Sequence, residues 1–161
     1  MAPPKTESNA DAAGPVPAGL NARQAKYYLA LQALLADGPN RFADLQRKGV
    51  KTTIKPNGSA DEKVYELTKP LPGFFYGGVT DTAAPDAFLY FEGNPTDEEQ
   101  VFDDYVQAIK ALMAHGQVQR FSETNWRIGD GTYQIWIRRE LKDRWHPEKV
   151  YQNMTLTILK L

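Results

Sequence analysis

The chain has 161 residues, a formal net charge of −1, 42% hydrophobic residues and no cysteine. One domain of this length can bury a substantial core. The lack of cysteine excludes disulfides, thiolate metal sites and cysteine nucleophiles. A net charge near zero provides no global field that would recruit nucleic acid or acidic lipid. The sequence contains no apolar run near the roughly 18 residues of a membrane-spanning helix, so we expect no membrane span.

The first twenty residues differ in composition from the rest of the chain. Residues 1–20 are rich in Ala, Pro and Gly and carry almost no bulky apolar side chain. Such a segment buries too little surface to offset the entropy lost on ordering. We therefore predict a disordered tail or linker over residues 1–20 and a single domain over residues 21–161. A Pro/Ala spacer favours a periplasmic or secreted protein, tethered through this linker, over a cytoplasmic one.

Residues 21–38 are predicted to form the first helix. Asn21 can cap its start, and Gln24 stands at the reciprocal position of a capping box. Apolar side chains then recur with helical period until an Asp-Gly-Pro sequence ends the pattern. Residues 41–48 predict one further short helical turn.

Four strands are predicted next, because the apolar period shifts from helical to alternating. They are expected over residues 50–55, 62–68, 74–80 and 87–92. The last of these segments is apolar on both faces, so we expect it in the interior of a sheet.

The most strongly marked element is a helix over residues 97–114. Thr96 and Glu99 form a capping-box pair at its start. Its apolar side chains, among them Phe102 and Ile109, fall within an arc of about 140° around the helix axis. This pattern predicts a helix that packs through one face onto an apolar surface.

Three more strands follow this helix. Residues 125–129 and 132–139 flank Asp130 and Gly131, a pair typical of a two-residue type I′ hairpin. A final strand is predicted over residues 150–161. The order α-(short α)-ββββ-α-βββ predicts an α+β fold, in which a mostly antiparallel sheet of about six or seven strands carries the long helix on one face.

The predicted hairpin suggests a binding surface. A type I′ turn at Asp130-Gly131 pairs Arg127 with Gln134 and Asn125 with Trp136, which places Trp136, Arg127 and Arg138 on the same face. Residues 117–161 hold eight basic and five acidic side chains, whereas the preceding part is acidic. Trp and Arg are enriched at binding hot spots. We interpret four residues as a site for another protein with an acidic surface: Asn125, Arg127, Trp136 and Arg138. In the alternative, the helix over 22–36 covers this face and Trp136 belongs to a second core layer.

Catalytic signals are sparse. The sequence contains no nucleophile elbow, Walker motif or paired-histidine metal motif, and we expect no catalytic site, no metal site and no cofactor. His146 lies near Asp143 and Glu148, and such a group could serve a hydrolase. His115 suits a helix C-terminus.

Three functions remain as hypotheses. The first is a non-catalytic protein-binding module, such as an inhibitor, an immunity-type protein, a chaperone or an accessory protein. The second is a carrier of an apolar small molecule in a cavity between helix and sheet, lined by aromatic side chains. The third is a hydrolase that depends on His146. Nucleic acid is not expected as a partner.

Overall fold

The computed structural model describes residues 16–54, 62–67, 71–74, 76–81, 87–93, 98–139 and 154–161. The helical elements are α2 (Ala22–Leu35), the 3-10 turn η1 (Gly38–Asn40), α3 (Ala43–Lys48) and α4 (Glu98–Leu112). The strands are β1 (Val50–Ile54), β2 (Glu62–Glu66), β3 (Tyr76–Asp81), β4 (Ala87–Gly93), β5 (Gln117–Ser122), β6 (Asn125–Gly129), β7 (Tyr133–Arg139) and β8 (Met154–Lys160). The α+β class and the antiparallel sheet are confirmed.

All eight strands form one sheet in the order β1-β2-β3-β4-β8-β7-β6-β5. Strands β1 to β4 form one antiparallel meander and β5 to β7 form another. The last strand, β8, lies between the two meanders and pairs with β4 and β7 along its whole length. Met154, Leu156 and Ile158 of β8 are fully buried. The C-terminal strand therefore joins the two halves of the sheet.

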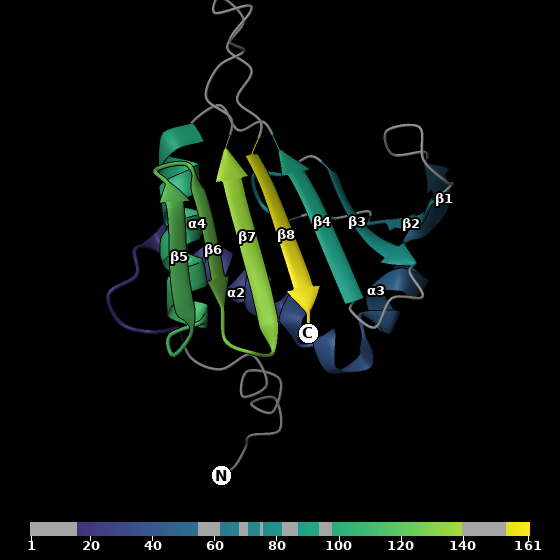
Figure 1. The fold of residues 1–161 in the computed structure, drawn as a ribbon, viewed down its shortest axis with the longest axis horizontal. Coiled ribbons are helices and arrows are strands. Elements are labelled where there is room, and N and C mark those ends of the chain that lie inside the picture. The colour runs from purple at the N-terminus through teal and green to yellow at the C-terminus, as the bar shows by residue number, and fades with distance from the viewer. Residues whose placement is uncertain are drawn as a thin grey trace, which may run out of the picture.

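The helices pack against one face of this sheet. In Figure 1 the labelled helices α2, α3 and α4 lie behind it. Phe102, Tyr105 and Ile109 of α4 are at most 1% exposed, so the predicted docking of the long helix is confirmed. The ring of Tyr27 on α2 stacks on Tyr105, with 3.9 Å between the ring centroids. Because α2 packs on α4, it lies on the same side of the sheet.

The start of α2 has the predicted capping box. The Asn21 side chain accepts a hydrogen bond from the backbone N–H of Gln24, and the Gln24 side chain accepts one from the backbone N–H of Asn21. Each bond satisfies a donor that the first turn of a helix leaves without an intrahelical partner. Within the predicted tail, residues 16–19 are exposed and Leu20 packs against the core. Residues 1–15 lie outside the described part.

Two features of the second meander correct the prediction. Strand β5 was not predicted, and it adds one strand to the predicted order. The hairpin register was also wrong: Arg127 lies opposite Trp136, and Asn125 lies opposite Arg138. The register differs from the predicted one by two residues, so every side chain keeps its predicted face.

The turn between β6 and β7 explains the shift. Asp130 is its first residue, not a central one, because its Oδ1 atom accepts hydrogen bonds from the backbone N–H groups of Thr132 and Tyr133. Gly131 has a φ of +88° and occupies the first central position, where a positive φ favours glycine. The backbone N–H of Asp130 donates to the Tyr133 carbonyl and closes the turn.

Candidate functional site

The described helices cover one face of the sheet and leave its other face open. Along β7, Ile135 and Ile137 are buried against the helices, whereas Trp136 and Arg138 between and beyond them are exposed. Strand β8 alternates in the same way, with half-buried Thr155 between buried neighbours. We call the face opposite α2 and α4 the outer face; it is toward the viewer in Figure 1.

Aromatic and cationic side chains alternate across the outer face of β5, β6 and β7. The guanidinium carbon of Arg127 lies 5.1 Å from the Phe121 ring centroid and 5.0 Å from the Trp136 ring centroid. The guanidinium carbon of Arg138 lies 5.7 Å from the same Trp136 centroid. Each contact is a cation–π interaction. We call these four residues, Phe121, Arg127, Trp136 and Arg138, the arginine–aromatic ladder.

Asn125 fixes the edge of the tryptophan ring. Its Oδ1 atom accepts a hydrogen bond from the Trp136 indole N–H. Asn125 also lies directly opposite Arg138 in the register. The structure thus brings together all four residues that the sequence singled out. Trp136 is 37% exposed, and α2 lies on the opposite side of the sheet. The alternative in which the helix over 22–36 covers this face is therefore wrong.

Sequence reasoning missed Phe121, because it did not assign β5. Phe121 is 54% exposed and is the residue of the ladder that lies on the edge strand β5. A usable signal was present: residues 117–122 directly precede the predicted strand at 125–129, and only Glu123 and Thr124 separate the two stretches. The signal is weak because the register shifts between Arg120 and Ser122, and this shift interrupts the alternation of side chains along the strand.

The ladder carries charge that no described carboxylate neutralises. Residues 117–139 contain four arginines and two acidic side chains. Within the described part of the chain, neither Arg127 nor Arg138 has an ion-pair partner. The ion pairs that the described residues form lie elsewhere and include Arg23 with Asp104, at 3.3 Å. The outer face of β5, β6 and β7 is therefore a cationic surface with two exposed aromatic rings, Phe121 and Trp136.

A hollow of about 530 Å³ adjoins the ladder at the end of the sheet where the α4–β5 connection meets the β6–β7 turn. Gly129 lies between Gln117 and Gln134 in the register, so this row of the sheet has no side chain at its centre. Arg127 lines the hollow beside these glutamines, and its buried Nε atom has no hydrogen-bond partner among the described residues. The lining is polar and suits hydrogen bonding rather than an apolar ligand.

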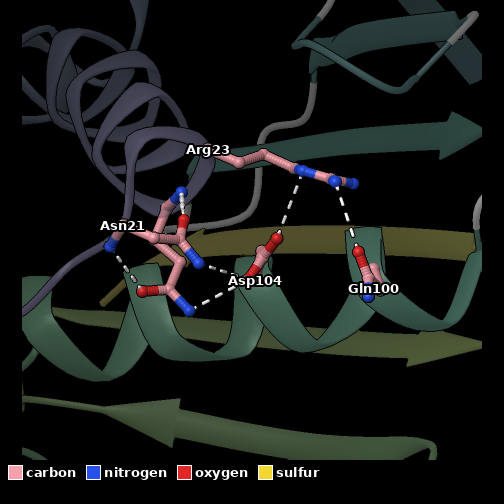
Figure 2. Close-up of polar contacts among 5 residues, drawn as sticks. Asn21, Arg23, Gln100 and Asp104 are labelled. Carbon is pink, nitrogen blue, oxygen red and sulfur yellow. Dashed lines mark hydrogen bonds and ion pairs between the residues drawn. The ribbon is translucent and has the colours of Figure 1, made fainter.

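A second polar cluster joins α2 to α4 and has a structural role. Figure 2 shows Asn21, Arg23, Gln100 and Asp104 at this junction. The Asp104 carboxylate accepts from the Gln24 side-chain amide at 2.9 Å and forms the ion pair with Arg23. These contacts anchor the start of α2 on the side of α4, since the capping residues themselves take part.

The sequence also pointed to two histidines. His146, Asp143 and Glu148 lie outside the described residues. His115 is exposed at the end of α4. Across the described ranges, no group of three His, Cys, Asp or Glu side chains could hold a metal ion.

The carrier hypothesis requires aromatic side chains that line a cavity, but several aromatic side chains fill the core instead. Phe74 packs on Tyr105 with 5.2 Å between ring centroids, and on Phe91 with 6.1 Å. All three side chains are buried, with at most 6% exposed. They therefore contact one another rather than line an empty space between helix and sheet.

None of the described helices has the length and apolar character to cross a bilayer. Comparison with known proteins finds no matching family model, no matching curated protein and no matching solved structure.

Proposed function

We propose that this protein is a non-catalytic protein-binding module, of the inhibitor, immunity-type, chaperone or accessory class, which binds an acidic partner surface through the arginine–aromatic ladder. The observation that carries the proposal is an exposed Trp136 flanked by Arg127 and Arg138 on a sheet face that no described helix covers. Large aromatic rings and arginines are the side chains that contribute most at protein interfaces.

The ladder is organised before any partner arrives. Asn125 holds one edge of the Trp136 ring, and Arg127 stacks between two rings. Side chains that are already ordered lose less conformational entropy when they bind. A cation–π contact does not use up the N–H donors of a guanidinium group, so these groups can still donate to a partner's carboxylates.

Arginines that no described carboxylate neutralises also favour an acidic partner kinetically. A cationic patch steers an oppositely charged partner, and this contribution falls as salt screens the charges. The Pro/Ala-rich residues 1–20 would act as a tether, which suits the proposed periplasmic or secreted location.

A peptide selection tests the proposal and does not require an identified partner. A display library of random twelve-residue peptides is selected on the immobilised protein at low and at physiological salt. We expect enrichment of Asp and Glu in the selected peptides, and loss of their binding to the Trp136→Ala and Arg138→Gln variants. Arg47→Gln is the matched control, because Arg47 is an exposed arginine on α3, away from the outer face.

Two results would contradict the proposal. In one, the selected peptides are not acidic, or bind the Trp136→Ala variant as tightly as the wild type. In the other, a single-stranded thymidine oligonucleotide binds the ladder more tightly than any acidic peptide, since stacking on aromatic rings and phosphate contacts with arginine are features of nucleic-acid sites.

A further inference from the structure

Strand β5 is the terminal strand of the sheet, and it projects beyond the core. Among the strands that the structure describes, it pairs with β6 alone. All six of its residues are exposed, among them Val118 at 45% and Phe121 at 54%. An edge strand presents a row of unpaired backbone N–H and C=O groups, which is a template for pairing with another chain.

Within the described ranges, the first part of β5 lacks the usual protection of an edge. Proteins commonly block edge pairing with proline, lysine, a bulge or a covering helix. Residues 117–119 contain neither proline nor lysine, and the register shift lies beyond them, between Arg120 and Ser122. The packing of α4 on the sheet is centred on β6 and β7.

Arginines flank β5 on both faces of the sheet. The Arg120 guanidinium lies over the Trp126 ring on the helix side, with 5.1 Å to the centroid. On the outer face, Arg127 stacks on Phe121. No described carboxylate forms an ion pair with Arg120 or Arg127. A strand placed beside β5 would meet a cation on its helix side and an aromatic ring on its outer side.

We propose that β5 accepts an extended acidic segment of the partner as a ninth strand, an inference that rests on the proposed function and specifies how the partner binds. Side chains of a strand alternate between its two faces. The added strand places acidic side chains on the face of Arg120 and apolar side chains on the face of Phe121. Backbone pairing supplies affinity, and these alternate side chains supply selectivity.

The probe is a blocked seven-residue peptide of alternating glutamate and valine. A second peptide has the same sequence with its central valine N-methylated, which removes one backbone donor and leaves the charge unchanged. A third alternates lysine and valine. Binding is measured by fluorescence polarisation, and amide hydrogen exchange of the full chain is followed by NMR with and without each peptide.

We expect the glutamate–valine peptide to slow exchange of β5 amides by about fivefold or more, with no change in β1. N-methylation should weaken binding by about tenfold, the effect of one lost backbone hydrogen bond in a paired strand. Arg120→Glu should abolish binding, whereas Arg47→Glu, which changes the net charge equally, should not. The lysine–valine peptide should not bind.

If the N-methylated peptide binds as tightly as the unmethylated glutamate–valine peptide, strand addition is wrong. The proposed acidic partner would not be contradicted, because charge alone would then account for binding. Protection confined to β1, or no binding of the glutamate–valine peptide, would also overturn strand addition. Failure of the peptide selection on the ladder is a separate result and would contradict the proposed function itself.

Discussion

The substitution Trp136→Ala tests whether Trp136 is a surface residue of the ladder or a core residue. The Trp136 ring has cation–π contacts with Arg127 and Arg138 and one hydrogen bond to Asn125. At exposed sites a cation–π contact contributes about 0.5–1 kcal/mol, and a hydrogen bond contributes about 0.5–1.5 kcal/mol net. Because Trp136 is 37% exposed, the low end of each range applies. We expect Trp136→Ala to lower the free energy of unfolding by about 1–2 kcal/mol.

The neighbouring residue supplies the control. Ile137 lies on the same strand, points to the opposite face and is fully buried. Ile137→Ala removes core contacts and leaves a cavity, so it should lower the free energy of unfolding by about 3–4 kcal/mol. With a urea m-value of about 2 kcal/mol/M, the midpoints should fall by about 0.5–1 M for Trp136→Ala and about 1.5–2 M for Ile137→Ala. Equal losses for the two variants would refute an open outer face.

Three further predictions concern the helix side of the sheet. Ile109→Ala should lower the free energy of unfolding by about 2–5 kcal/mol in a urea titration, because Ile109 is fully buried. Gln107 is exposed, so Gln107→Ala should change this free energy by no more than about 0.5 kcal/mol. Equal effects of the two substitutions would contradict the docking face of α4. Burial, and then the charge of Tyr27, raises the pKa of Tyr105 above its ordinary value. The unfolded chain loses this proton near pH 10 while the folded chain keeps it, so stability should be full below about pH 10 and fall above it. Tyr105→Phe should flatten that fall, and an unchanged slope would refute the assignment. Asp104→Asn should lower the free energy of unfolding by about 1–2 kcal/mol, because the Asp104 carboxylate binds Arg23 and the Gln24 side-chain amide of α2. Amide exchange should become faster in α2 alone. Equally faster exchange along the whole chain would contradict the anchoring role of Asp104.

Features that depend on neighbouring residues could be predicted from the sequence. The Asn21–Gln24 capping box and the apolar stripe of α4 are local patterns, and both occur in the structure. The grouping of Trp136 with Arg127 was correct despite a wrong register. A shift of two residues preserves the face of every side chain, whereas a shift of one would have reversed it.

Features set by distant contacts could not be predicted in the same way. No local pattern places β8 between β4 and β7, because pairing on both sides depends on segments far apart in sequence. The side of the sheet that α2 occupies is decided by its packing on α4, in which Tyr27 stacks on Tyr105. Phe121 was missed because β5 has all its side chains exposed and a register shift, so it shows neither a buried face nor a regular period.

The most direct measurement of the central claim is the affinity of a selected acidic peptide for the wild type, Trp136→Ala and Arg47→Gln, each at two salt concentrations. If the aromatic and cationic side chains of the ladder bind the peptide, Trp136→Ala should weaken binding by about tenfold or more, and Arg47→Gln should leave it unchanged. Salt should also weaken wild-type binding. Equal affinity of the wild type and Trp136→Ala would contradict the assignment of the ladder as the binding site.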